Sequence, residues 1–143
     1  MSIRTAIYQR LAQDTELVTR LAKRPSSVGG GPAIYEAWAA PDSAMPYINL
    51  TYQTAPGNHE YKRVTTLNID LFASTTDSTV PEAISNHIQK RLHMQPIYTA
   101  DDGLIRMYLD NELELLDDSP GVSHWNITFT VIHWPKSLIE FAP

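Results

Sequence analysis

The sequence predicts an α+β fold: a single domain with an antiparallel sheet of about four main strands, covered on one face by N-terminal and central helices. Four segments alternate apolar and polar residues, which is typical of antiparallel strands with one packed face and one solvated face. Two other segments repeat apolar residues at helical spacing. The length of 143 residues, of which 43% are hydrophobic, fits one ordinary domain covering residues 1–143.

Residues 1–24 are expected to be helical because they contain neither proline nor glycine and place Ile3, Ile7 and Leu11 on one helical face. A shorter apolar stripe follows at Leu17, Val18 and Leu21, and Asp14 or Thr15 can cap it. The stretch therefore forms either two short helices or one kinked helix. Residues 25–32, Pro-Ser-Ser-Val-Gly-Gly-Gly-Pro, have the composition of a flexible linker.

Residues 33–74 are predicted to hold strands. A short apolar segment at 33–38 is followed by two alternations, Ile48-Leu50-Tyr52 and Leu67-Ile69-Leu71, with a turn signal between them at 55–58. The 25–32 linker and the 55–61 turn are both expected to be mobile in the isolated chain and to become ordered on docking.

The second half is loosely like the first, with a helix followed by strands, although the sequence shows no internal repeat. Residues 80–93 form an amphipathic helix with Ile84, Ile88 and Leu92 on one face and Pro81 at the first turn. Residues 98–103 are expected to be a loop. Residues 104–134 then form a hairpin around the turn residues 117–121.

Acidic residues gather on this hairpin. Residues 101–118 hold seven carboxylates and one arginine, a local net charge of −6. Uninterrupted alternation puts Asp110, Glu112 and Glu114 on one strand face. The opposite face would carry the apolar residues Ile105, Met107, Leu109, Leu113 and Leu115.

Three interpretations of the acidic row stay open: a catalytic or Mg²⁺ patch, a solvated strand face, and a surface that must not hold DNA. Side chains along one strand face diverge, whereas catalysis needs carboxylates that converge. For an isolated domain this favours the solvated face.

Composition and motifs argue against most enzyme classes. The absence of cysteine excludes disulfides, thiolate metal sites and cysteine nucleophiles. The five histidines lack metal-binding spacing, and no serine lies in a Gly-x-Ser-x-Gly elbow. No catalytic, metal or cofactor-binding residue is therefore predicted. A net charge of −5 disfavours general nucleic-acid binding, and no apolar run approaches the roughly 18 residues of a membrane helix.

Five aromatic residues are expected at strand ends or in loops, where aromatic side chains are enriched in protein interfaces. They are Trp38, Tyr47, Tyr61, Trp134 and Phe141. Each of them can instead anchor the local core.

The order of these elements resembles a known family. Helices are followed by a small-residue linker, the Ile34-Tyr35 strand, a loop closing on Met45-Pro46-Tyr47-Ile48, a helix with Ile84, Ile88 and Leu92, and a final hairpin. Over about residues 3–134 this resembles the tail-completion family of tailed bacteriophages, also called tail-terminator or head–tail joining proteins.

The resemblance implies a structural virion protein without enzymatic activity or cofactor. Such subunits form a ring, commonly a hexamer, that ends the tail tube and docks on the head connector while DNA passes through the lumen. The implied partners are further copies of the chain, the tail tube protein and the head–tail connector proteins. The implied place is the tail or neck of a virion assembled in the bacterial cytoplasm.

A DNA-conducting lumen gives the acidic row a role, because carboxylates repel phosphates and let DNA slide. The residues expected to face the lumen or its rim are Asp110, Glu112, Glu114, Asp117 and Asp118. Two alternatives remain: another phage neck component such as a head-closure protein, and a monomeric α+β ligand-binding domain.

Overall fold

A computed structural model describes residues 3–39, 43–54, 62–74, 79–99, 103–115 and 121–134. These ranges contain three α-helices, α1 (Ile3–Ala12), α2 (Thr15–Arg20) and α3 (Thr79–Leu92), and a short 3-10 helix, η1 (Ser26–Val28). They also contain the strands β1 (Ile34–Glu36), β2 (Tyr47–Thr54), β3 (Arg63–Ser74), β4 (Ile97–Thr99), β5 (Gly103–Leu115) and β6 (Val122–His133). No helix in these ranges is long and apolar enough to cross a membrane.

Within these ranges the strands form one six-stranded sheet in the order β1-β2-β3-β6-β5-β4. β1 runs parallel to β2, and the other neighbouring pairs are antiparallel. The predicted α+β fold with an antiparallel sheet of about four strands was therefore wrong: the sheet is mixed, has six strands and dominates the chain.

The two edge strands explain the error. β1 and β4 have three residues each, too few to show an alternating pattern, and β4 occupies part of the segment 98–103 that was expected to be a loop. After β1 the chain turns back, so that β2 lies beside β1 and runs parallel to it, with Ile34 opposite Ile48.

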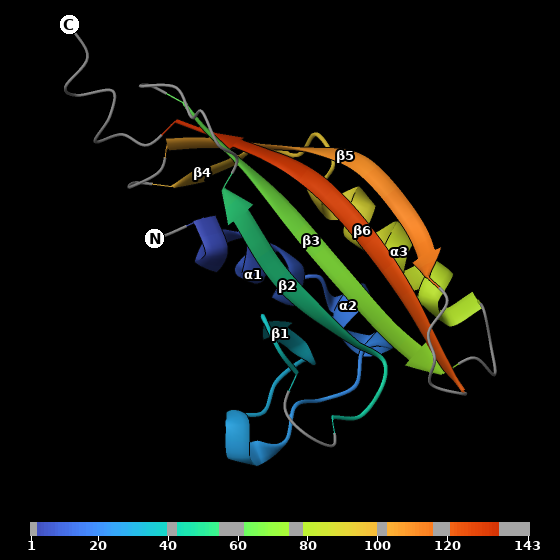
Figure 1. Cartoon of the computed structure of the whole chain (residues 1–143). Coiled ribbons are helices and arrows are strands. Elements are labelled where there is room, and N and C mark those ends of the chain that lie inside the picture. Colours follow the sequence, from blue (N-terminus) through green and yellow to red (C-terminus); the bar gives the residue numbers. More distant parts are fainter. Residues whose placement is uncertain are drawn as a thin grey trace, which may run out of the picture.

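The three α-helices lie behind the curved sheet in the view of Figure 1 and cover one of its faces. The core forms between these layers. Fully buried helix residues include Ile7, Leu11, Leu17, Ile84 and Ile88, and fully buried strand residues include Leu67, Ile69, Leu71, Ile127 and Phe129. Each such side chain contributes roughly 1.5–3 kcal/mol of transfer free energy, so this one-sided core is the main source of stability.

A β-bulge interrupts β5. Leu109 lies opposite Phe129, but Asn111 already lies opposite Thr128, so Asp110 is an extra residue in β5. Because side chains alternate faces along a strand, the extra residue exchanges the two faces beyond it. The alternation predicted across residues 105–115 was therefore wrong beyond Leu109: Met107 is buried, whereas Leu113 and Leu115 are 46% and 38% exposed.

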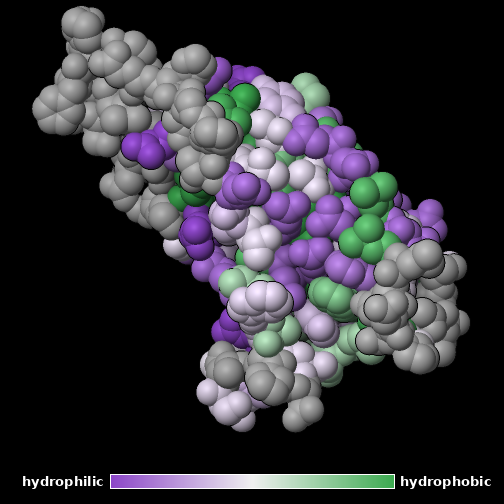
Figure 2. Space-filling model, in the orientation of Figure 1, coloured by the Kyte–Doolittle hydropathy of each residue, from purple (hydrophilic) through white to green (hydrophobic). Residues whose placement is uncertain are grey.

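The sheet face away from the helices carries no covering helix in the described part of the chain (Figure 1). Figure 2, in the same orientation, shows this face as mainly hydrophilic or intermediate, with apolar side chains at its margin over β5. We call it the open face. Its central rows include Asn68, Asp70, Asn126 and Thr128, which alternate with the buried residues of β3 and β6.

The predicted linker 25–32 contains the 3-10 turn η1 and is tied to Arg24. The Arg24 backbone N–H donates to the Gly31 carbonyl at 2.9 Å, and its side-chain Nε donates to the Gly30 carbonyl at 2.9 Å. Whether this segment is mobile in the isolated chain stays a prediction. The 55–61 turn lies outside the described residues.

Candidate functional site

The aromatic residues predicted as interface positions occupy different environments. Trp38 follows β1, which ends where Ala37 adopts a φ of 69°, and its side chain is 85% exposed. Tyr47 and Trp134 are partly buried. Tyr61 and Phe141 lie outside the described residues. Trp38 is thus the described member of this set with an essentially free aromatic surface.

Tyr47 belongs to a row of rings that crosses the open face. Its ring stacks on Phe72 with centroids 5.1 Å apart and meets Tyr35 edge-on at 6.0 Å. Phe72 stacks in turn on His124 at 4.3 Å. In register, Tyr47 lies opposite Phe72, Phe72 opposite His124, and His124 opposite Leu115, so the row continues to an exposed leucine.

A polar network lies beside this row. The Asp70 carboxylate oxygen Oδ1 is 2.9 Å from His124 Nε2 and accepts a hydrogen bond from Asn126 Nδ2 at 3.0 Å. Thr128 Oγ1 lies 3.0 Å from Asn126 Oδ1 and 3.3 Å from Asn68 Oδ1. These bonds run between side chains of β3 and β6, so they stabilise the sheet itself.

The described members of the predicted acidic row do not share one face. Thr130 donates a hydrogen bond to the Asp110 carboxylate on the open face. On the helix face, Glu112 accepts hydrogen bonds from Ser85, at 2.8 Å, and from Gln89 of α3. Glu114 is exposed opposite Trp125, and Asp117 and Asp118 lie outside the described residues. The β-bulge after Leu109 causes this division. The alternating sequence of β5 did not indicate the bulge.

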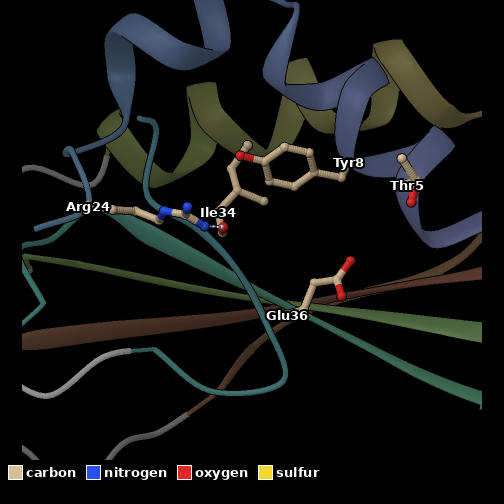
Figure 3. Close-up of a pocket in the computed structure, with 5 residues that line it drawn as sticks. All are labelled: Thr5, Tyr8, Arg24, Ile34 and Glu36. Carbon is tan, nitrogen blue, oxygen red and sulfur yellow. Dashed lines mark hydrogen bonds between the residues drawn. The ribbon is translucent and has the colours of Figure 1, made fainter. Parts of the chain in front are cut away.

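A groove of about 450 Å³ lies between α1 and β1 (Figure 3). Thr5 and Tyr8 line it from α1, Ile34 and Glu36 from β1, and Arg24 from the segment after α2. In Figure 3 the Glu36 carboxylate points from β1 toward α1, and Arg24 Nη1 donates to the Ile34 carbonyl at 3.4 Å. Glu36 is exposed and has no ion-pair partner among the described residues.

Tyr52 on β2 lies near this groove. The Arg4 guanidinium lies 4.8 Å from the centre of its ring, and its buried hydroxyl has no hydrogen-bond partner in the described part of the chain. Burial raises the pKa of Tyr52, the nearby Glu36 carboxylate raises it further, and Arg4 acts in the opposite direction. The phenol therefore stays neutral and unpaired beside an exposed carboxylate.

A second distinctive surface lies around β4, at the other edge of the sheet. Met94, which follows α3, is 65% exposed, and Tyr98 on β4 is 74% exposed. Tyr98 lies opposite Leu104 on β5, so Arg106, two residues further along, projects from the same face. Arg106 is exposed, lines a small pocket with Met94 and Tyr108, and has no ion-pair partner among the described residues.

Asp14 joins the helices rather than serving a site. Its Oδ1 caps α2 by accepting the backbone N–H groups of Glu16 and Leu17, and its Oδ2 accepts Arg91 Nε at 2.9 Å. His87 of α3 lies 3.9 Å from Asp14 and 3.4 Å from Glu16. Asp14 was one of two predicted caps, and the structure confirms it; its ties to α3 are the part that the sequence did not reveal.

The exposed side chains of these surfaces include aromatic, methionine and arginine residues, types that are enriched in protein interfaces. The described residues contain no group of three or more metal-ligating side chains. The described histidines, His87, His93, His124 and His133, take part in the packing and bonding of the fold: His93 Nδ1, for example, accepts the Leu109 backbone N–H at 2.9 Å. What stands out instead are exposed aromatic and methionine side chains beside unpaired charges.

Sequence reasoning missed Glu36, Met94, Tyr98 and Arg106. None of them lies in a motif, and each becomes notable only because an edge strand places it beside other exposed groups. The one available signal was residue type, since aromatic residues, methionine and arginine are enriched at interfaces.

Comparison with known proteins gives a fold relationship. No family model and no curated protein sequence matches the chain. Among solved structures, a chain from the "Virion of native gene transfer agent (GTA) particle" is similar, with a TM-score of 0.74 and 15% sequence identity. The match covers 93% of this chain and 95% of that chain, so the two share a fold over nearly their whole lengths.

Proposed function

We propose that the chain is a structural virion protein: a subunit of a ring that ends a phage tail tube and joins it to the head connector, with DNA passing through the lumen. The observation that carries the proposal is the fold shared with a virion chain over 93% of this sequence, at a TM-score of 0.74. The order of helices, linker, strands and hairpin that resembles tail-completion proteins supports the finer assignment to a tail terminator.

The exposed surfaces suit a subunit that is completed by neighbours. Aromatic residues and methionine are enriched in protein interfaces relative to the rest of the surface. Here Trp38, Met94 and Tyr98 are each more than 60% exposed, and all three belong to residue types that are common in interface cores.

The acidic residues of β5 suit the rim of a DNA channel. β4 pairs only with residues 103–105 of β5, so the later part of β5 has no neighbouring strand on its outer side among the described residues. Asp110 and Glu114 are both exposed on this margin, where they project from opposite faces of the sheet. Carboxylates there would repel the phosphates of transiting DNA.

Removal of the gene from the producing phage tests the proposal. A tail terminator is expected to leave DNA-filled heads without attached tails, together with tubes of uncontrolled length. Restoring the gene in trans should restore joined particles with tubes of uniform length. Both are scored by negative-stain electron microscopy of lysates.

Other outcomes separate the alternatives. Tails of normal length beside heads that lose their DNA would indicate a head-closure protein instead. Normal infectious particles in the absence of the gene would contradict a structural role and favour a monomeric ligand-binding domain.

A further inference from the structure

Two surfaces of the chain complement each other and lie at different edges of its sheet. The β1 surface consists of Glu36, Trp38 and the groove wall formed by Thr5 and Tyr8. The β4 surface consists of Met94, Tyr98 and Arg106. The strand order places β1 and β4 at the two edges of the sheet.

The two surfaces are also separated along the strands. β1 lies beside residues 48–50 of β2, which pair with residues 69–71 of β3. β4 lies beside residues 103–105 of β5, and Ile105 pairs with His133 of β6, which lies opposite Arg63 at the start of β3. Figure 1 accordingly shows β4 and β1 well apart. Two different neighbouring subunits can therefore contact the chain, one at each surface.

Their chemistry matches in sign and in type. Glu36 and Arg106 are oppositely charged, exposed and without an ion-pair partner among the described residues. Glu36 is two residues from Trp38, which is 85% exposed, and Arg106 is two residues from Leu104, the register partner of Tyr98, which is 74% exposed. A groove of about 450 Å³ beside Glu36 leaves room for a projecting side chain.

We infer that these surfaces bind each other between successive copies of the chain, the β4 surface of one subunit docking on the β1 surface of the next. Two different patches on one subunit form a heterologous contact, which closes into a ring when its rotation permits. Arg106 then reaches Glu36 at the groove, and Met94 and Tyr98 cover Trp38. This inference rests on the proposed ring and names the contact that builds it.

Thiol cross-linking tests the contact directly, because the natural chain has no cysteine. A Glu36→Cys/Arg106→Cys variant, treated with a short bismaleimide under conditions of assembly, should give a ladder of dimers, trimers and larger products. Each single variant should stay monomeric on a denaturing gel. A Glu36→Cys/Glu82→Cys variant, with its second thiol on the exposed start of α3, serves as the matched control and should give no ladder.

Charge reversal supplies an independent measurement. Glu36→Arg or Arg106→Glu alone should weaken self-association by about tenfold or more, because a like-charge pair then faces the interface. The combined variant should recover most of the loss, measured by sedimentation or light scattering. Circular dichroism of each variant shows whether the fold is kept.

The results of these experiments separate a failure of the Glu36–Arg106 contact from a failure of the proposed ring. Defined oligomers without the Glu36–Arg106 ladder and without charge rescue would overturn this contact while leaving the ring in place. Efficient dimers from one single-cysteine variant would overturn it in favour of a two-fold contact. A chain that stays monomeric at high concentration and in mature particles would overturn both the contact and the ring.

Discussion

Asp14 shows how one buried carboxylate holds two helices together. It is 2% exposed, caps α2 through two backbone N–H groups and binds Arg91 of α3, 77 positions away in sequence. Its identity as a cap follows from residue type and from its place before the Leu17 stripe. The pairing with Arg91 does not follow from the sequence, because nothing local to either residue records how α2 and α3 meet.

Replacing Asp14 should therefore cost more than the loss of a surface charge. Asp14→Ala is expected to lower the free energy of unfolding by about 2–3 kcal/mol, because it removes the cap and leaves Arg91 without its carboxylate. Asp14→Asn should cost less, since the amide oxygen can still cap the helix. Urea unfolding at neutral pH measures both, and equal effects of the two substitutions would contradict the assignment.

The same residue predicts a pH dependence. Burial alone would raise the pKa of Asp14, but the hydrogen bonds from Arg91 and from the Leu17 and Glu16 N–H groups outweigh it, so the pKa lies below its ordinary value of 3.8. A lowered pKa stabilises the fold above the unfolded-state value, and this stabilisation is lost as pH falls through the folded-state value.

The difference in stability between the wild type and Asp14→Asn should accordingly be present at neutral pH and shrink below about pH 4. Urea unfolding across this range measures it. A difference that stays unchanged down to about pH 2.5 would show that the charge of Asp14 contributes nothing.

Replacing Tyr52, unlike replacing Asp14, is not expected to lower the free energy of unfolding. Its buried hydroxyl has no partner among the described residues, so Tyr52→Phe should leave the free energy of unfolding unchanged or raise it by up to about 1 kcal/mol. Tyr35→Phe is the matched control, because the Tyr35 hydroxyl is bonded to Ser43 at 3.1 Å and its loss should cost about 1 kcal/mol. A larger loss from Tyr52→Phe than from Tyr35→Phe would contradict this account.

At the scale of elements, the bulge in β5 determines which residues face the core. The four long strands could be predicted because their alternation is read directly from residue types. The bulge could not, because one extra residue leaves the sequence pattern of β5 looking continuous while its register changes at Asp110. The same missed bulge made the prediction for the acidic row wrong: the row was expected on one face of the sheet and is divided between both faces.

Substitutions on either side of the bulge test its consequence. Met107→Ala should lower the free energy of unfolding by about 2–5 kcal/mol because Met107 is fully buried. Leu113→Ala should change it by only about 0.5 kcal/mol, since Leu113 is 46% exposed. Uninterrupted alternation would make the two residues equally costly, so comparable losses in urea unfolding would contradict the bulge.

The pairing of the short edge strands is the second feature that could not be predicted from the sequence. β1 and β4 exist because long neighbours offer them backbone partners, not because three residues have a strong preference of their own. The surfaces that they carry, with Glu36 and Arg106, were consequently absent from the predicted site. Trp38 was predicted as an interface position, because aromatic side chains at strand ends or in loops are enriched in protein interfaces.

For the molecule as a whole, the proposed channel makes a prediction about charge. Glu114→Lys should slow the ejection of DNA from particles, because a lysine at the rim attracts the phosphates that the carboxylate repels. Glu16→Lys makes the same change of charge on α2, which packs against α1 and α3, and should leave ejection unchanged. Ejection rates followed by dye uptake measure both, and equal behaviour of the two variants would argue against an acidic lumen.

The arrangement of the layers is consistent with a subunit whose surface is finished by others. Helices cover one face of the sheet, while the other face and both edges carry aromatic, methionine and charged side chains. A ring built from heterologous contacts would cover two edges on every copy. The position of the chain in an assembled particle therefore decides whether it is such a subunit.

Cryo-electron microscopy of intact, purified particles tests that claim most directly. We expect a closed ring of this fold between the tail tube and the head connector, with DNA passing through its centre and β1 of each copy against β4 of the next. Density for this chain elsewhere in the particle, or no density for it at all, would contradict the proposed function.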